Sequence, residues 1–329
     1  MISTAYAAAA RYRRRHYAIH PELRRKLVRP VISIGNLAVG GRAKTPLAAL
    51  VARRLLALGE RPAILSRGYG RRDAPDGVVV VRDPRGIRAD LDRAGDEPLM
   101  LARQLDGVAV LVSSSRYLAG RLAEHHFAST VHVLDDGFQH FALHRDADIV
   151  AIGRADLENA ATLPSGRLRE PIDAAAAADA FVMLDEEPGP ALTHLGRPAW
   201  RALRRHGAAR LADASGTPID PAAGPIVAVA GIAHPEGFFR DLRGAGWTIA
   251  REMPYRDHHR YDESDLARIA AAARDSGARL IVTTEKDLVR LLPFRPFAVP
   301  VACLPMTLEI EPAGALDAWL AGTLERVRR

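Results

Sequence analysis

The stretch from Val31 to Leu50, VISIGNLAVGGRAKTPLAAL, constrains the fold more than any other part of the chain. It begins with a short apolar run typical of a buried strand and ends with a run of good helix formers. A glycine-bearing turn and the pair Lys44-Thr45 lie between them. A strand, a glycine loop, Lys-Thr and a helix form the arrangement that cradles phosphate groups. The stretch therefore predicts a nucleotide site, with an ordinary glycine-containing turn before a helix as the alternative.

The nucleotide loop is predicted to consist of Gly40, Gly41, Arg42, Ala43, Lys44 and Thr45. Backbone N–H groups of the loop and of the first helical turn favour an anion at one point. Lys44 adds a point charge for the outer phosphates, and the Thr45 hydroxyl is suited to Mg²⁺. Ala43 stands where the usual spacing has glycine, and an alanine with positive φ there would cost roughly 1–2 kcal/mol.

Composition narrows the class of protein. The chain has 329 residues, which suits two domains of ordinary size, and a formal net charge of +7. That charge comes almost wholly from arginine; the lysines are Lys26, Lys44 and Lys286, and the last two lie in motif-like segments. The single cysteine, Cys303, excludes an internal disulfide and fits a reducing compartment. No apolar run reaches the ~20 residues of a spanning helix, and no secretory signal is expected at the N-terminus.

Residues 1–29 form a strongly basic segment with interleaved tyrosines. If it is helical up to Pro21, the segment is a basic amphipathic helix suited to a membrane surface. A solvated helix packed on its own domain is one alternative. Nucleic-acid contact is another, disfavoured because no recognised nucleic-acid module follows. We therefore expect a membrane surface as a partner, and no nucleic acid.

Polar loops follow or precede other predicted elements of the first half. Tyr69 lies in SRGYG after a strand at 62–65, Asp96 lies in AGDEP before a helix, and Arg116 follows a strand at 108–112. Ligands of open α/β sheets bind outside the carboxyl ends of strands, so the loops that follow strands should border one crevice. The alternatives are a surface turn for Tyr69, a helix N-cap for Asp96 and a plain surface arginine for Arg116.

Asp135 and Asp136 come directly after an apolar strand at 131–134. An acid at the end of a hydrophobic strand is the second half of a P-loop enzyme, where it holds the metal or its waters. We predict that Thr45, Asp135 and Asp136 hold Mg²⁺, with a pair of turn aspartates as the alternative. Glu170, in the polar loop LPSGRLREP, faces either substrate or solvent.

The alternation of strands and helices predicts a mostly parallel sheet, covered on both faces, in a domain spanning residues 1–185. Composition shifts near Glu186, and we predict a linker over residues 186–225 with a hairpin around 211–217. A smaller α/β domain is expected over residues 226–329. The linker is also expected to act as a hinge.

The second half offers a pair of adjacent residues with acid–base character, Asp257 and His258. The carboxylate would fix the orientation of the imidazole, which titrates near working pH; a local turn bond between neighbours is the alternative. A metal site made of His258, His259 and His234 is disfavoured, because adjacent histidines lack the i, i+4 spacing of a helical zinc pair and no cysteine supports them.

Eight motifs together resemble those of the tetraacyldisaccharide 4′-kinase family of bacterial lipid A synthesis: GNLAVGGRAKTP, SRGYGR, AGDEP, LDDGFQH, LREP, GIAHPEGFF, DHH and TTEKD. They appear in the family's order from about Ile32 to Arg290. The resemblance implies a P-loop domain with a mostly parallel sheet, joined by a hairpin linker to a smaller C-terminal α/β domain.

The resemblance also implies the reaction: transfer of the γ-phosphoryl group of ATP, with Mg²⁺, to the 4′-hydroxyl of a tetraacyldisaccharide 1-phosphate. The substrate is then an acylated disaccharide lipid, met at the cytoplasmic face of the bacterial inner membrane by a peripheral enzyme. Asp96 matches the family's base on the hydroxyl, and His258 matches the histidine that pairs with it. Arg116 resembles a nucleotide-site residue, and Tyr69 and Glu170 resemble substrate-site residues.

Two other functions stay open on the residues themselves. One is a different P-loop kinase or a GTPase acting on a soluble substrate, although a guanine-specificity segment such as N-K-x-D is missing. The other is a non-enzymatic membrane- or nucleic-acid-binding module that uses the basic segment. The acids Asp135 and Asp136 after a strand argue against this second function.

Overall fold

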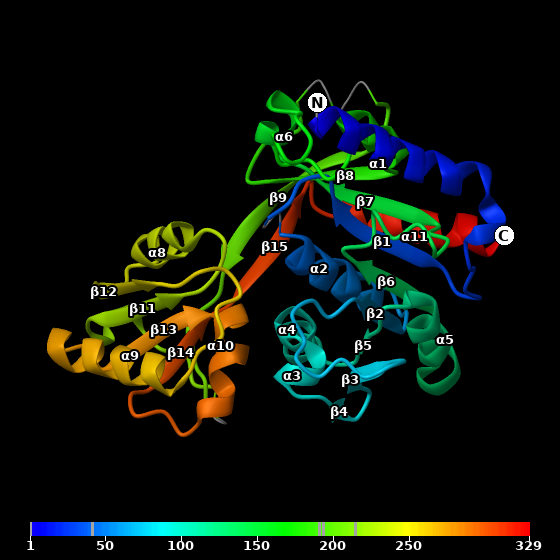
Figure 1. The fold of residues 1–329 in the computed structure, drawn as a ribbon. Coiled ribbons are helices and arrows are strands. Elements are labelled where there is room, and N and C mark those ends of the chain that lie inside the picture. Colours follow the sequence, from blue (N-terminus) through cyan, green and yellow to red (C-terminus); the bar gives the residue numbers. More distant parts are fainter. Residues whose placement is uncertain (1, 41–42, 190–191, 193–194, 214–215) are drawn as a thin grey trace. The chain divides into compact units, whose positions relative to one another are not determined.

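The structure is a computed structural model that describes residues 2–40, 43–189, 192, 195–213 and 216–329. The chain folds into two compact units (Figure 1). The larger unit comprises Met1–Arg204 and Leu308–Arg329, and the smaller unit comprises Arg205–Thr307. Each unit is built on its own sheet.

A ten-stranded sheet forms the larger unit, in the order β15-β9-β8-β7-β1-β6-β2-β5-β3-β4. Its strands are β1 (Val31–Asn36), β2 (Pro62–Ser66), β3 (Val79–Asp83), β4 (Gly86–Ile87), β5 (Ala109–Val112), β6 (Val131–Asp135), β7 (Ala147–Ala151), β8 (Ala180–Leu184), β9 (Ala199–His206) and β15 (Met306–Glu311). The strands from β9 through β5 pair in parallel, whereas β3 pairs antiparallel with β5 and β4. The predicted mostly parallel sheet is confirmed.

The central strands are apolar along most of their length because helices cover the sheet. Every residue of β1, β2, β5, β6 and β7 is buried, as expected for parallel strands between helical layers. α2 (Lys44–Ala57) contacts β1, β2 and β6, α4 (Asp96–Gln104) contacts β3 and β5, and α5 (Arg116–Phe127) contacts β2 and β5. Among the described residues, the other helices of this unit are α1 (Ile2–Ile19), α3 (Leu91–Ala94), α6 (Arg154–Glu158) and α11 (Ala315–Arg328), with 3-10 turns at Pro21–Leu23 and Ile172–Ala177.

The smaller unit has a five-stranded sheet in the order β10-β14-β13-β11-β12. Its elements are β10 (Arg210–Leu211), β11 (Ile226–Ala230), α8 (Pro235–Gly244), β12 (Ile249–Pro254), α9 (Glu263–Ser276), β13 (Leu280–Thr284), α10 (Glu285–Leu291) and β14 (Val301–Leu304), with 3-10 turns at Pro221–Ala223 and Leu292–Phe294. Along β11, Ile226, Ala228 and Ala230 join one apolar cluster, and Val227 and Val229 join another. Because strand side chains alternate in direction, the unit has core on both faces of its sheet.

The division between the units differs from the predicted domain boundaries. β9 belongs to the large sheet although it lies in the predicted linker 186–225, and β15 and α11 belong to the larger unit although they lie in the predicted domain 226–329. α11 contacts α2, and the ring of Trp319 lies 5.7 Å from that of Trp200 in β9. These boundaries were wrong because composition marks polar segments and does not show which sheet a strand joins. The hinge that we placed in the linker stays a prediction.

The hairpin predicted around residues 211–217 is confirmed. The N–H of Leu211 donates to the carbonyl of Thr217 at 2.9 Å, and the N–H of Ile219 donates to the carbonyl of Ala209 at 2.8 Å. One arm of the hairpin, β10, pairs antiparallel with β14. The hairpin is therefore an edge of the smaller sheet.

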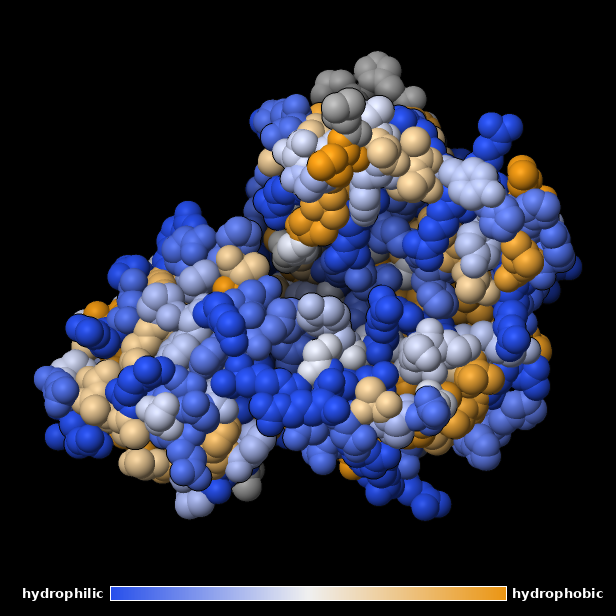
Figure 2. Space-filling view, in the orientation of Figure 1, coloured by the Kyte–Doolittle hydropathy of each residue, from blue (hydrophilic) through white to orange (hydrophobic). Residues whose placement is uncertain are grey.

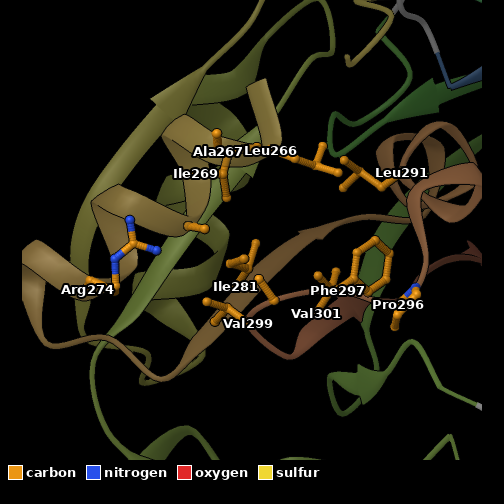
Figure 3. Close-up of a pocket in the computed structure, with 12 residues that line it drawn as sticks. Leu266, Ala267, Ile269, Arg274, Ile281, Leu291, Pro296, Phe297, Val299 and Val301 are labelled. Carbon is orange, nitrogen blue, oxygen red and sulfur yellow. The ribbon is translucent and has the colours of Figure 1, made fainter. Parts of the chain in front are cut away.

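A cavity of about 350 Å³ lies in the smaller unit between α9 and the segment 296–301 (Figure 3). Its lining is mostly apolar, and Phe297 stands among the aliphatic side chains (Figure 3). The strand residues that line it, Ile281 and Val301, stand at or next to the amino ends of β13 and β14. His258 follows the carboxyl end of β12. The cavity is therefore separate from the predicted site.

The surface of the N-terminal segment exposes several apolar side chains next to its arginines. Ile2, Tyr12, Ile19 and Val28 each have more than half of their surface exposed. The face of the molecule in Figure 2 is mostly hydrophilic, with small hydrophobic areas between. Within the described ranges, we find no helix with the length and apolar character needed to span a membrane.

Candidate active site

The carboxyl ends of the central parallel strands meet at one edge of the large sheet. Ile34 of β1 pairs with Asp135 of β6, and Ser66 of β2 pairs with Val112 of β5. β2 and β6 also pair in parallel. The loops after β1, β2, β5 and β6 therefore begin side by side, at the edge where open α/β sheets bind ligands.

The loop after β1 is held by the segment that contains LREP. The N–H of Val39 donates to the carbonyl of Arg167 at 2.8 Å, and the N–H of Arg169 donates to the carbonyl of Leu37 at 2.6 Å. Gly40 has a φ of 98°, and a Cβ at this position would lie 2.9 Å from the Arg167 guanidinium. A side chain at position 40 would therefore disturb both the backbone and this neighbour.

Ala43 ends the loop in the left-handed conformation. It is the N-cap of α2, with φ 52° and ψ 28°, and its carbonyl accepts the N–H of Leu47 at 2.9 Å. A residue with a Cβ pays about 1–2 kcal/mol in this region, so the loop tolerates the methyl group at an energetic cost. Two other predicted loop residues, Gly41 and Arg42, lie outside the described residues.

Lys44 and Thr45 begin α2, as predicted for the end of a phosphate loop. The Lys44 ammonium lies 3.1 Å from Oδ1 of Asn36 and 3.3 Å from Oδ1 of Asp136, and Thr45 is buried. The amide nitrogen of the Asn36 side chain is buried with no hydrogen-bond partner among the described residues. N–H groups of the first helical turn, an ammonium and a spare amide donor together favour an anion at this edge.

Asp135 is a buried carboxylate with one unsatisfied oxygen. Its Oδ2 accepts a hydrogen bond from the Ser66 hydroxyl at 3.3 Å, and its Oδ1 has no partner among the described residues. Burial, with the negative charges of Glu97 and Asp136, raises the pKa of Asp135 to about 7. Because a buried unpaired charge is costly, a cation at Oδ1 would stabilise the ionised form.

Asp136 has two cationic partners. Nη1 of Arg169 lies 3.0 Å from both carboxylate oxygens, and the Lys44 ammonium lies 3.3 Å from one of them. Burial alone would raise the pKa of Asp136, but the charges of Lys44 and Arg169 outweigh it, and the pKa lies below its usual value. Asp136 is therefore ionised at neutral pH and fixes the position of Lys44.

The residues near Asp135 fit a hydrated divalent cation better than a cage made by the protein alone. Across the part of the chain that the structure describes, no group of three or more His, Cys, Asp and Glu side chains is arranged to hold a metal. Mg²⁺ usually keeps several waters and takes one or two carboxylates together with substrate phosphates. The spare oxygen of Asp135 and the hydroxyl of Thr45 are suitable ligands for such an ion. Asp136 is less suitable, because its carboxylate is already paired with Lys44 and Arg169.

Asp96 is the first residue of α4, and Gly95 before it is the N-cap. The carboxylate is buried, and its Oδ1 accepts the N–H of Glu97 at 2.9 Å. A Cβ on Gly95 would lie 2.9 Å from the carbonyl oxygen of Tyr69, so the SRGYG and AGDEP segments pack against each other. The structure thus places Asp96 beside the loop after β2. The alternative in which Asp96 is the helix N-cap is wrong, because Gly95 takes that position.

Arg116 is a buried cation at the start of α5, with 5% of its surface exposed. Burial, followed by the positive charge of Arg67, lowers its pKa to about 10 despite the opposing charges of Asp135 and Asp136. Arg116 therefore stays charged at neutral pH, and the surface-arginine alternative is wrong. Tyr69, in contrast, is 70% exposed.

Glu170 is buried and bound to the N-terminal helix. Nε and Nη2 of Arg14 lie 2.7 and 2.9 Å from the two carboxylate oxygens of Glu170. Glu170 therefore faces α1, an arrangement that the sequence did not suggest. Its role in substrate binding stays a prediction.

His258 belongs to the smaller unit, where it follows β12 with a φ of 56°. The backbone N–H of His258 donates to Oδ1 of Asp257 at 3.0 Å, whereas Nε2 of the imidazole lies 3.8 Å from Oδ2 of Asp257. The second distance is too long for a hydrogen bond. The hydrogen bond is thus the local turn bond, while the two side chains approach only to ion-pair distance. That Asp257 orients the imidazole stays a prediction.

Lys286 makes a hydrogen-bond contact with the His258 imidazole. Its ammonium lies 3.1 Å from Nε2 of His258 and 3.5 Å from Oδ1 of Asp257. An ammonium group can only donate, so this contact fits the neutral tautomer that carries its proton on Nδ1. Lys286 stands in α10 within the TTEKD motif.

Asp287, the next residue, organises the loops around His258. Its buried carboxylate accepts the N–H of Gly231 at 3.0 Å and the hydroxyls of Tyr261 and Thr284 at 2.8 and 2.6 Å. The guanidinium of Arg290 lies 3.2 Å from the same carboxylate. This residue therefore ties Gly231 of the GIAHP segment and Tyr261, which follows the DHH segment, to the end of β13.

Sequence reasoning left four site residues unassigned: Asn36, Arg14, Arg169 and Lys286. Two carried a signal, because Arg169 lies in LREP and Lys286 is one of very few lysines. Asn36 and Arg14 carried none, since their roles depend on partners that the fold brings from distant parts of the sequence.

After β1 a loop offers backbone donors and a lysine, and at the end of the neighbouring strand β6 an aspartate has a spare oxygen. This arrangement is typical of P-loop phosphotransferases. Such enzymes move a phosphoryl group mainly by positioning it and balancing its charge. The acceptor is not given by this apparatus.

Comparison with known proteins gives the family. The model of the tetraacyldisaccharide-1-P 4'-kinase family, LpxK, matches residues 1–325. The chain therefore belongs to this family of lipid A biosynthesis kinases. It is a phosphotransferase with an alcohol group as acceptor, and the alternatives of a GTPase or a non-enzymatic binding module are excluded.

Relatives and a solved structure agree with this membership. The tetraacyldisaccharide 4'-kinase of Pelobacter propionicus is 41% identical over 296 residues, covering 88% of this chain and 81% of the relative. That of Geobacter sulfurreducens is 42% identical over 291 residues, covering 87% and 81%. The "apo" form LpxK from Aquifex aeolicus, solved in complex with ATP, superposes with a TM-score of 0.81 at 29% identity and covers 98% of this chain and 97% of that one.

Proposed function

We propose that this chain uses ATP and Mg²⁺ to phosphorylate the 4′-hydroxyl of a tetraacyldisaccharide 1-phosphate, with the phosphate loop after β1 as its nucleotide site. The observation that carries the proposal is the Lys44 ammonium, 3.3 Å from Asp136 at the end of a loop closed by a left-handed Ala43. Loop N–H groups and Lys44 bind the outer phosphates, and Arg116 supplies a second, buried cation.

Thr45 and Asp135 would hold the Mg²⁺, with Asp136 beside them. When bound, the ion supplies charge neutralisation between the phosphates. The spare Oδ1 of Asp135 is the oxygen that the protein offers. Asp136 contributes mainly by holding Lys44 and Arg169 in place.

Asp96 is the proposed base. It accepts the proton of the 4′-hydroxyl as the hydroxyl oxygen bonds to the γ-phosphorus and the bond to the β,γ-bridging oxygen breaks, which releases ADP. His258, from the smaller unit, supports this transfer in the neutral form that its contact with Lys286 favours. Tyr69, which is exposed, and Glu170, which is buried, are proposed to contact or order the sugar substrate.

The enzyme is proposed to meet its lipid substrate peripherally, at the cytoplasmic face of the bacterial inner membrane. α1 exposes arginines at positions 11, 13 and 15 together with the apolar side chains of Ile2, Tyr12 and Ile19. Basic side chains near a surface of anionic lipid contribute about 1 kcal/mol each, and the apolar side chains add burial at the interface. An acylated disaccharide and a membrane surface are thus the partners, with no nucleic acid.

The test is incubation of the full chain with Mg-ATP and detergent-dispersed tetraacyldisaccharide 1-phosphate. Mass spectrometry should show a product heavier by one phosphate group, and Lys44→Met and Asp96→Asn should each slow its formation by about 10²-fold or more. Wild-type turnover in either variant would refute the role given to that residue. Exchange of the acceptor for one that lacks the 4′-hydroxyl is the matched control.

A further inference from the structure

The helix α1 carries one arginine that differs in position from its neighbours. Apart from His16, the half-buried residues of α1 are Ser3, Ala7, Ala10, Arg14 and Tyr17, which is the three- and four-residue spacing of a single helix face. The arginines immediately before and after position 14 are exposed, although the Arg13 guanidinium also lies 5.2 Å from the ring centre of Phe141. Arg14 thus lies on the face that packs against the protein.

The Arg14 guanidinium is held by a buried carboxylate and two aromatic rings. Its guanidinium makes two hydrogen bonds to Glu170, at 2.7 and 2.9 Å, and 4% of the Glu170 side chain is exposed. The same guanidinium lies 4.4 Å from the ring centre of Phe138 and 4.9 Å from that of Phe141. A planar fork that binds a carboxylate and stacks on rings is specific to arginine.

Both partners of Arg14 are close in sequence to groups that build the phosphate site. Glu170 follows Arg169, whose side chain binds both oxygens of Asp136 and whose N–H binds the carbonyl of Leu37 in the loop after β1. Phe138 comes two residues after Asp136 and packs on β1: a Cβ on Gly35 would lie 2.4 Å from its Cβ. Arg14 therefore ties together the two segments that hold Asp136.

We propose that Arg14 is a positioning residue for the phosphate-binding site and not one of the charges that meet the membrane. By holding Glu170 and Phe138 it fixes Arg169 and Asp136, and through Asp136 the Lys44 ammonium. The exposed arginines of α1 face the lipid, so the helix joins the membrane surface to the order of the phosphate loop. This inference rests on the proposed nucleotide role of that loop.

The matched control is Arg11, which also forms an ion pair between α1 and the same part of the chain. Its Nε lies 2.9 Å from Oδ2 of Asp173, and more than half of each side chain is exposed. An exposed pair of this kind contributes little, and Arg11 has no link to Asp136. Arg11→Met and Arg14→Met remove the same charge from the same helix.

The experiment uses the full chain and two measurements on each variant. One is the dissociation constant of Mg-ATP without lipid; the other is partition onto vesicles of phosphatidylcholine with phosphatidylglycerol. We expect Arg14→Met to weaken Mg-ATP binding by roughly 2- to 30-fold, the range for residues that act through a contact network, and to leave vesicle binding nearly unchanged. Arg11→Met should leave Mg-ATP binding unchanged and weaken vesicle binding by about fivefold.

The opposite result, in which both variants lose vesicle binding alike and Arg14→Met binds Mg-ATP as the wild type does, would overturn the inference. If Arg14→Met does not fold, Arg14→Lys keeps the charge and loses the fork, and wild-type nucleotide affinity in that variant overturns it equally. Failure of the wild-type chain to bind Mg-ATP refutes the proposed nucleotide site instead, so the two failures are distinct.

Discussion

Replacing Ala43 by glycine tests whether the phosphate loop stores backbone strain. Ala43 has φ 52° and ψ 28°, a region where a Cβ is disfavoured and where glycine is at ease. The change removes one methyl group and leaves the contacts of Lys44 with Asn36 and Asp136 in place. It therefore isolates the conformational term.

Two opposing terms set the size of the effect. Release of the left-handed strain stabilises the folded chain by about 1–2 kcal/mol. Glycine also widens the unfolded ensemble, which costs about 0.4–1 kcal/mol. The net result is a stabilisation of roughly 0–1.6 kcal/mol, with a middle value of about 0.8 kcal/mol. The sign of the change in unfolding free energy is the test, because an alanine-to-glycine change inside an ordinary helix destabilises by about 1 kcal/mol.

The assay is the free energy of unfolding of the larger unit, from urea denaturation of the variant and two controls. Ala128 is exposed and has φ 50° at the end of α5, far in sequence from the loop. Ala318 is exposed within α11. We expect Ala43→Gly and Ala128→Gly to stabilise the protein, and Ala318→Gly to destabilise it.

A loss of stability in Ala43→Gly comparable to that in Ala318→Gly would refute the reasoning, since it would mean that the left-handed geometry carries no strain. A gain in Ala128→Gly alone would show that the assay detects such strain and that Ala43 lacks it. Mg-ATP affinity is measured alongside, and we expect it to be equal or tighter in Ala43→Gly.

Three other changes test charges that are buried or partly buried. In the ligand-free protein the pKa of Asp135 in the folded state is about 7, above its ordinary 3.8, so the folded state binds more protons and stability falls as pH rises between these values. Asp135→Asn should flatten that pH dependence and raise the free energy of unfolding by roughly 1–3 kcal/mol at pH 8, while Mg-ATP binding is lost. An unchanged pH dependence of stability in this variant would contradict the prediction. Lys286→Met should give nitrogen-15 NMR signals of mixed His258 tautomers where the wild type shows the Nδ1–H form; identical spectra would show that Lys286 does not set the tautomer. Asp287→Ala should lower the unfolding free energy of the smaller unit by roughly 3–5 kcal/mol, and a loss under 1 kcal/mol in the urea transition would count against its place at the centre of that unit.

Much of the larger unit was predictable because its information is local. The apolar runs that became β1, β2, β5 and β6 have no other stable placement than a covered parallel sheet. The polar residues after them, Lys44, Arg116 and Asp135 among them, then had to meet at one edge. The pattern of strands and loops placed these candidate residues, whereas the order of the strands in the sheet was not predicted.

What could not be predicted depends on pairing between distant segments. β9 and β15 are separated by about a hundred residues in sequence and are neighbours in the sheet. Neither strand has a sequence pattern that identifies its partner. The same holds for Arg14 with Glu170, where two charged residues could as well have faced solvent. Asp257 and His258 show a related case: adjacency in sequence suggested a hydrogen-bonded side-chain pair, but the hydrogen bond between them comes from the His258 backbone and the imidazole bonds Lys286.

The distribution of backbone strain links these observations. Among the described residues, five that are not glycine have positive φ, and three of them are Ala43, Asp136 and His258. Each costs of order 1–3 kcal/mol and persists only where surrounding contacts over-determine it. At Asp136 those contacts are Arg169 and Lys44, and at His258 they are Asp257 and Lys286. The neighbouring side chains therefore hold these residues in a backbone conformation that they would otherwise avoid. Replacing those neighbours should for this reason reduce activity more than it reduces the stability of the fold.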